Sequence, residues 1–145
     1  MYALSRLEQI EEKIISNKIL LAETKTKSVK ACALKLNSQA AIFFDTSKFN
    51  TTSEEVLALT HEYYHVEYDV FYTFNDSLQT RKRREFKANY YTALELLPPS
   101  EFKLALKSME PYEIAEKFNV TEDFIREAYR IYKAKGMIWC KLLYT

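Results

Sequence analysis

The chain is organised around the stretch Ala58-Leu59-Thr60-His61-Glu62-Tyr63-Tyr64-His65, which contains the pattern H-E-x-x-H. The two histidines of this pattern are the only ones in the 145 residues. Residues four apart lie on the same face of a helix, so both imidazoles can reach one metal ion. Glu62 is turned by about 100° from His61, because a helix has about 3.6 residues per turn. Its carboxylate can therefore reach a water on that metal without ligating the metal.

A zinc hydrolase needs this arrangement. Two neutral imidazole nitrogens hold Zn²⁺, and a carboxylate takes the proton from zinc-bound water. The same pattern also occurs by chance in helices of unrelated proteins, where the histidines cap the helix or pair with neighbours. Two conditions separate these alternatives: the motif must lie in a real helix, and an acidic third ligand must follow at a plausible distance.

The residues before the motif have the features of a helix start. Thr52 precedes Glu55 by three residues, which is the spacing of a capping box, and acidic groups suit the positive end of a helix. Apolar residues at helical spacing then supply a face to bury, namely Val56, Leu57, Leu59 and Tyr63. The first condition is therefore met.

A further helix is predicted over residues 85–97. Pro98-Pro99 marks its end, because proline disfavours helical backbone in the residue before it. Its expected core stripe consists of Phe86, Tyr90, Ala93 and Leu97. Glu85 begins this helix on a different face and follows His65 by 20 residues, with a loop long enough to return. Glu85 is thus either the third ligand or a surface acid beside four bases, and the spacing alone leaves both alternatives open.

These motifs resemble the ImmA/IrrE family of zinc metallo-endopeptidases, which are cytoplasmic proteins common on prophages and mobile elements. The pattern is H-E-x-x-H, then E-x-x-A-N-x-[FY] after a variable loop, then a Leu-Leu-x-Pro stop. The resemblance covers roughly residues 5–135, including the order of helix, small sheet and motif helix. The matching residues are His61, Glu62, His65, Glu85, Ala88, Asn89, Tyr90 and the stop at 96–99.

The resemblance implies that His61, His65 and Glu85 ligate zinc and that Glu62 is the catalytic base. It also implies that the substrate is a helix-turn-helix repressor encoded nearby, whose cleavage derepresses a mobile element or a stress response. The family usually has glycine before the second histidine, whereas this chain has Tyr64, which needs space or must point elsewhere. The alternative to a peptidase is therefore a non-catalytic module that contains zinc and holds a regulator.

The residues before the motif helix predict one helix and a small sheet. Residues 2–17 carry apolar residues at helical spacing and form an amphipathic first helix. Three strand-like runs follow, separated by polar breaks that are short enough for hairpin turns, at 18–23, 29–36 and 40–45. We therefore expect a three-stranded antiparallel sheet, whose edge could accept an extended substrate strand.

The stretch after the motif is rich in aromatic residues and bases. Residues 67–80 could line or cover a substrate cleft, or they could form an ordinary loop that its aromatics pin to the core. For the run Arg81-Lys82-Arg83-Arg84 we favour a solvated helix face over a contact with phosphate or an acidic partner. The candidates for stabilising an oxyanion, which the sequence does not rank, are Tyr64, Tyr68, Tyr72 and Tyr91.

The C-terminal part reads as two helices, 113–118 and 122–135, joined by a short turn. Thr121 is a good N-cap and Gly136 a good C-cap. Four bases on the second helix could read DNA, namely Arg126, Arg130, Lys133 and Lys135. We favour instead two short helices that pack under the zinc site. An apolar tail follows, which could add a strand to the sheet or dock on a partner.

Composition sets the broad class of the chain. A chain of 145 residues with 48% hydrophobic and 14% aromatic residues can bury the core of one domain. The net charge of +1 gives no reason to invoke nucleic acid or an anionic membrane. No apolar run approaches the roughly 18 residues of a membrane span, and the first residues do not resemble a signal peptide. We expect a cytoplasmic protein, with Cys32 and Cys140 as free buried thiols.

The sequence thus predicts an α+β fold: a single, mostly helical zincin-like domain with a small antiparallel sheet before the metal-binding helix. Within it we expect a metalloprotease core at 1–100, a helix-turn-helix-like part at 101–136 and an apolar tail at 137–145. The expected cofactor is Zn²⁺ and the expected partner is a protein substrate. Nucleic acid and membrane are not expected partners, and the oligomeric state stays open.

Overall fold

The computed structural model describes residues 3–68, 71 and 76–138. Contacts divide the chain into two compact units, Met1–Arg84 and Glu85–Thr145. The described residues form six α-helices, one short 3-10 helix and a small three-stranded sheet, and the fold is 60% helical. The expectation of a mostly helical α+β chain is therefore confirmed. None of the described helices combines the length and the apolarity that crossing a bilayer requires.

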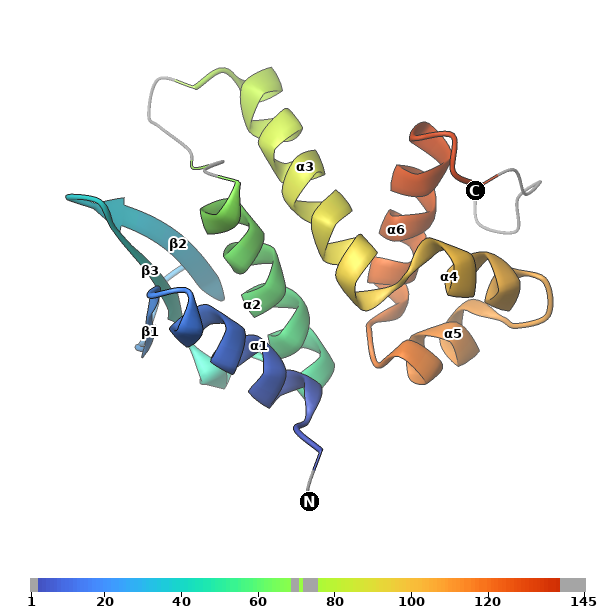
Figure 1. Ribbon diagram of the computed structural model, residues 1–145, viewed down its shortest axis with the longest axis horizontal. Helices are drawn as coiled ribbons and strands as arrows, with labels where there is room; N and C mark the ends of the chain where they lie inside the picture. Colours follow the sequence, from blue (N-terminus) through green and yellow to red (C-terminus); the bar gives the residue numbers. More distant parts are fainter. Residues whose placement is uncertain (1–2, 69–70, 72–75, 139–145) are drawn as a thin grey trace. The chain divides into compact units, whose positions relative to one another are not determined.

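The first unit holds the whole sheet and the motif helix (Figure 1). Helix α3 begins in this unit and continues into the second. In chain order the elements are α1 (Arg6–Ser16), β1 (Leu20–Glu23), β2 (Ala31–Leu36), β3 (Gln39–Phe44), η1 (Thr46–Lys48), α2 (Thr52–Glu67) and α3 (Leu78–Leu96).

The sheet is mixed, so the expectation of an antiparallel sheet is wrong. The central strand β3 pairs with β1 in parallel and with β2 in antiparallel orientation, in the order β1-β3-β2. Strands β2 and β3 form a tight hairpin, in which Asn37 and Ser38 have φ values of 49° and 70°. The link 24–30 is not a hairpin turn, because it carries the chain past β3 to the opposite edge. Apolar alternation predicts which face of a strand is buried, but it does not encode the strand's neighbour or direction.

Asp45 holds this link in place. Its buried carboxylate accepts hydrogen bonds from the Thr26 N–H at 3.0 Å and from the Ser47 hydroxyl at 2.6 Å. The Ser47 N–H donates at 3.1 Å, and the Lys25 ammonium lies 3.8 Å away. The hydrogen bond from the Ser47 side chain, followed by that from the Thr26 backbone, lowers the pKa of Asp45 to about 2.

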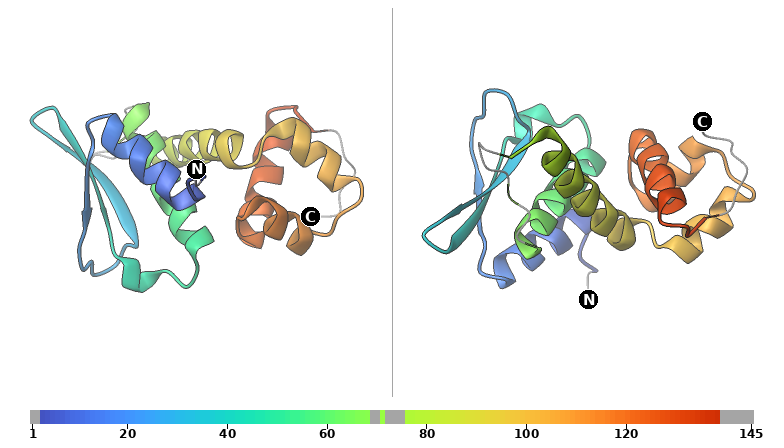
Figure 2. Two further views of the ribbon diagram at one scale, coloured as in Figure 1. Left: turned by 60° about the horizontal axis from the view of Figure 1, so that its bottom comes forward. Right: turned by 90° about the horizontal axis from the view of Figure 1, so that it is seen from above.

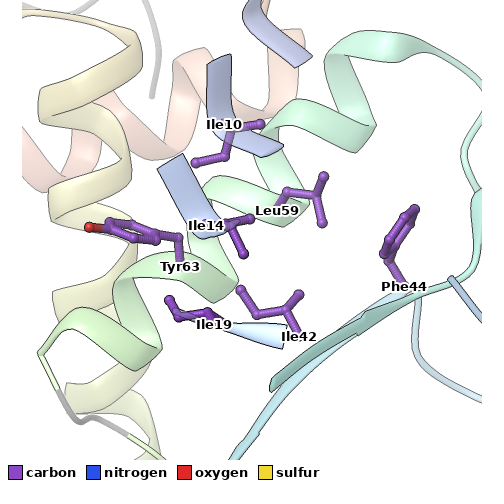
Figure 3. Packing of buried hydrophobic residues seen from close by; sticks show 7 residues of the cluster. All are labelled: Ile10, Ile14, Ile19, Ile42, Phe44, Leu59 and Tyr63. Atoms are coloured by element: carbon purple, nitrogen blue, oxygen red, sulfur yellow. The ribbon is translucent and has the colours of Figure 1, made fainter. Parts of the chain in front are cut away.

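Helices α1 and α2 lie side by side and cover one face of the sheet (Figures 1 and 2). The side chains between these layers form the core of the first unit (Figure 3), and they are Ile10, Ile14, Ile19, Ile42, Phe44, Leu59 and Tyr63. Leu59 and Tyr63 both belong to α2. They fix its rotation, so that His61 and His65 are turned away from this core, about 200° around the helix from Tyr63.

The second unit contains the rest of α3 followed by α4 (Pro99–Leu106), α5 (Pro111–Phe118) and α6 (Glu122–Ala134). Tyr132 of α6 is fully buried, and its hydroxyl donates a hydrogen bond of 2.8 Å to the carbonyl oxygen of Leu97. Burial, and then the neighbouring Tyr90, raise the pKa of Tyr132. This bond ties α6 to the junction between α3 and α4.

The predicted pair of C-terminal helices is present. Helix α5 starts at Pro111, two residues before the expected start, and ends at Phe118, after which the C-cap Asn119 has a φ of 55°. Thr121 caps α6 by accepting a hydrogen bond of 3.1 Å from the Phe124 N–H, as its sequence position predicts. Gly136 follows with φ 71°, a conformation that glycine adopts without strain. Of the apolar tail, everything from residue 139 onward lies outside the described residues.

Helix α3 begins seven residues earlier than expected, at Leu78. Arg81, Lys82 and Arg83 are exposed on it, as expected of a solvated helix face. Phe86 was expected in the core stripe, but it is 37% exposed. The reason is that the buried face passes through Ala88, and a residue two positions away is turned by about 200°. The buried positions of α3 are Ala88, Thr92, Ala93 and Leu96.

Of the two cysteines, Cys32 is a free thiol and is only half-buried. Cys140 lies outside the described residues.

Replacing Asp45 with Asn should make stability less dependent on acid. The carboxylate has a lowered pKa when folded, so its stabilisation is complete above its ordinary pKa of 3.8 and is lost as the pH falls towards about 2. We expect Asp45→Asn to lower the melting temperature by several degrees at pH 7 and to flatten its decline between pH 4 and pH 2. Thermal unfolding followed by circular dichroism measures this. The exposed acid Asp123, replaced with Asn, is the control, and equal behaviour of the two variants would contradict the role of Asp45.

Replacing Tyr132 with Phe should destabilise the protein by about 1–3 kcal/mol, because the buried carbonyl of Leu97 loses its donor. Urea unfolding measures the free energy. Tyr112→Phe is the matched control, since Tyr112 is 60% exposed on α5 and should change stability by less than about 0.5 kcal/mol. A Tyr132→Phe variant as stable as this control would show that the hydrogen bond contributes nothing.

Candidate metal centre

The motif lies within one unbroken helix. Thr51 is the N-cap of α2, and its hydroxyl accepts a hydrogen bond of 3.2 Å from the Glu54 N–H. The cap is therefore one residue earlier than the expected Thr52. Both threonines have a glutamate three residues later, so the local sequence fits either register. Since α2 continues to Glu67, it contains the whole motif and meets the first condition for a metal site.

The two histidines converge as their spacing predicts. Their Nε2 atoms are 3.0 Å apart, and their rings meet edge to face with centroids 4.6 Å apart. Two nitrogens that bind one tetrahedral zinc ion at about 2.0–2.1 Å are separated by about 3.3 Å. The observed separation is therefore close to that of two ligands sharing an ion. Without an ion, the same distance suits a hydrogen bond from one ring to the other.

Glu85 joins the histidine pair. One ligand atom from each of His61, His65 and Glu85 lies within 4.8 Å of the other two. His65 is buried, whereas His61 and Glu85 are half-buried. Two imidazole nitrogens and one carboxylate oxygen form the donor set of many hydrolytic zinc sites, and other transition metals accept it too. The cluster can therefore hold a metal ion, and it meets the second condition that the sequence left open.

Glu62 lies half-buried on the flank of α2 next to His61. Its negative charge contributes to the environment of Cys32 on β2. Burial is the main cause that raises the pKa of the Cys32 thiol, and the charge of Glu62 raises it further. The charge of Glu62 is thus near enough to β2 to act on the Cys32 thiol.

Tyr64 occupies the opposite flank of α2, because the positions of residues 62 and 64 differ by about 200° around the helix. Its hydroxyl accepts a hydrogen bond of 3.4 Å from the ammonium of Lys13 on α1. The ring stacks on Tyr68 with centroids 5.9 Å apart and planes inclined by 14°. The Lys13 nitrogen also lies 5.3 Å from the centroid of the Tyr64 ring. The Tyr64 side chain is therefore accommodated towards α1.

The four tyrosines considered for an oxyanion have different surroundings. Tyr64 is the least suited, since its hydroxyl is turned to Lys13, and Tyr68 stacks on it. Tyr91 tilts against Tyr90 with centroids 5.2 Å apart. Tyr72 lies outside the described residues, as do residues 69, 70 and 73–75 of the aromatic stretch.

Arg84 is a residue whose role sequence reasoning missed. It was grouped with the solvated bases, yet it is half-buried. Its guanidinium donates to the carbonyl oxygen of Phe71 and to the carboxylate of Asp76. These bonds tie the segment after α2 to α3, one residue before Glu85. The only signal of this role in the sequence is Asp76, eight positions before Arg84, and helical or strand spacing does not predict a contact over that separation.

Removing one ligand should weaken metal binding strongly. We expect one Zn²⁺ or Co²⁺ per chain, and we expect His65→Ala and Glu85→Gln each to lower the affinity by about 100-fold or more. Loss of a ligand should exceed the roughly 10–100-fold effect of losing a group that only orients one. Competition with a chromophoric chelator measures the affinity. Glu101→Gln, at an exposed acid of α4, is the control, and a Glu85→Gln variant that binds like this control would remove Glu85 from the site.

Comparison with known proteins adds no relative: no protein-family model, no curated protein and no solved structure matches the chain.

Proposed function

We propose that this chain is a zinc-dependent endopeptidase. The observation that carries the proposal is the convergence of His61, His65 and Glu85, whose ligand atoms lie within 4.8 Å of one another. Glu62 adds a carboxylate beside His61 on the same helix, α2. This combination of a metal-ion site with an adjacent base is what hydrolysis of a peptide bond requires.

In the proposed reaction Glu62 moves a proton. His61, His65 and Glu85 would hold a zinc ion, which would supply Lewis acidity that polarises a carbonyl and lowers the pKa of water towards about 7. Glu62 accepts a proton from the attacking water, whose oxygen forms a bond to the carbonyl carbon. As the carbon–nitrogen bond breaks, Glu62 returns this proton to the leaving amine.

The edge of the sheet is consistent with a substrate whose chain is extended around the cleaved bond. Strand β2 is an edge strand, and it packs on α2, the helix that carries Glu62. The carbonyl of Lys30 accepts from the Asp45 N–H at 3.0 Å, towards β3. Because alternate residues of an antiparallel strand bond to opposite sides, Ala31 and Ala33 turn their backbone groups to the outer edge. A peptide segment can add to this edge as a further strand.

The described part of α6 argues against a DNA reader. Arg126 lies 3.9 Å from Asp123, and Arg130 lies 3.0 Å from Glu127. The first turn of α6 carries two exposed acids, Glu122 and Asp123. In a recognition helix this turn would face the bases and phosphates, where negative charge is unfavourable. We therefore keep a protein as the proposed substrate, and the family resemblance suggests a helix-turn-helix repressor encoded nearby.

The test is cleavage of the co-encoded repressor by purified, zinc-loaded protein, followed by gel electrophoresis and mass spectrometry. Loss of a general base costs about 10²–10⁴-fold in rate, so we expect Glu62→Gln to cleave at least about 100-fold more slowly. Its zinc content should stay at one ion per chain, because Glu62 is not a proposed ligand. Glu101→Gln should cleave at the normal rate.

Two results would change the proposal. Equal cleavage by Glu62→Gln and the unchanged protein would remove Glu62 as the base. If neither protein cleaves the repressor but both bind it, the non-catalytic module replaces the peptidase.

A further inference from the structure

The four bases near the start of α3 do not share one environment. Arg84 is half-buried and donates to the carboxylate of Asp76, whereas the side chains of Arg81, Lys82 and Arg83 are exposed. Within residues 3–68, 71 and 76–138, none of these three exposed side chains has an ion pair or a hydrogen-bond partner. Their positive charges are therefore available to a binding partner.

Helical geometry separates two of these bases from the third. Because α3 is one unbroken helix (Figure 1), each residue is turned by about 100° from the one before it. Arg81 and Lys82 precede Glu85 by four and three residues, so both lie within about 60° of Glu85 around the helix. Arg83 precedes Glu85 by two residues and is turned from it by about 200°. Arg81 and Lys82 thus lie one turn, about 5–6 Å along the helix axis, from the candidate metal ligand.

The side of α3 that carries Glu85 changes from exposed to buried along the helix. Leu78, seven residues before Glu85 on this side, is 69% exposed. Glu85 itself is half-buried, and Thr92, seven residues after it, is buried. A chain that reaches a metal ion on Glu85 and continues along α3 can therefore follow only the exposed half. This half is called the basic face below, and it consists of Leu78, Arg81 and Lys82.

We propose that Arg81 and Lys82 select substrates that have acidic side chains beside the cleaved bond. This inference rests on the proposed function, because it places the cleaved bond next to Glu85. The guanidinium and the ammonium would pair with two substrate carboxylates, and Leu78 would contact an apolar side chain further along the substrate. Nucleic acid fits the basic face less well, since two bases neutralise few phosphates and Leu78 offers a phosphate no polar group.

The probes are pairs of short fluorescent peptides that end in a hydroxamate, a group that chelates zinc. The two peptides of a pair differ only beside the hydroxamate, where one has two glutamates and the other two glutamines. One pair carries the hydroxamate at the carboxyl end and a second pair at the amino end, so both chain directions are covered. Fluorescence anisotropy measures their binding to the zinc-loaded protein. In one pair we expect the glutamate peptide to bind about 5–20-fold more tightly at about 50 mM salt, and this preference should shrink at about 0.5 M salt.

Matched variants separate the basic face from the rest of the run of bases. Arg81→Gln and Lys82→Gln should each lower the preference for glutamate by about 2–5-fold, and the double change should remove it. Arg83→Gln is the control, because it removes the same charge from an exposed position on the far side of the same helix. It should keep the preference. Each variant should still bind one zinc ion per chain, since none of these bases is a proposed ligand, and circular dichroism confirms that each is folded.

Four outcomes would overturn the proposal. Equal binding within both pairs of peptides would do so, as would absence of binding by all of them. A preference that Arg83→Gln lowers as much as Arg81→Gln would show a general effect of net charge. Binding of a single-stranded DNA that the double change abolishes, without a preference for glutamate, would assign the basic face to nucleic acid.

These binding measurements do not need cleavage, so the two proposals can fail separately. A protein that prefers the glutamate peptides but cleaves no repressor would refute the peptidase and leave the basic face as a binding site. Cleavage of the repressor without any preference for glutamate would refute the role of Arg81 and Lys82 alone.

Discussion

The burial of Leu59 and Tyr63 is the constraint on which the candidate site depends. These side chains are 0% and 4% exposed, and each contributes about 1.5–3 kcal/mol by leaving water. They lock α2 against α1 and the sheet in one rotation. If the helix were rotated by one residue position, about 100°, both imidazoles would turn together away from their present direction. Apolar packing thus sets where His61 and His65 point.

Features that depend on residues close together in the sequence could be predicted. The convergence of His61 and His65, the cap at Thr121 and the helix stop before Pro98 all depend on residues within one or two turns. The parallel pairing of β1 with β3 could not be predicted, because it depends on a link that Asp45 holds from 19 residues away. The same holds for Phe86, whose exposure follows from which face of α3 is buried rather than from its own apolar character.

The candidate site shows the same division. The convergence of His61 and His65 follows from their spacing alone. Glu85, by contrast, could be told from other surface acids only through the resemblance to a peptidase family. The direction of Tyr64 depends on Lys13, which is 51 residues away in the sequence. Arg84 lies in a run of bases that composition marks as solvated, and only the fold separates it from the others. Long-range partners of this kind leave no periodic signal.

The unequal burial of the three candidate ligands would have a kinetic consequence. His65 is enclosed, while His61 and Glu85 are partly open to solvent. An ion held by all three would exchange by stepwise dissociation, in which the outer donors detach first and the inner imidazole last. An incoming chelator would therefore attack from the outer side and form a ternary complex with the ion still on His65. Metal loss from such a site depends on the identity of the competing ligand and not only on its concentration.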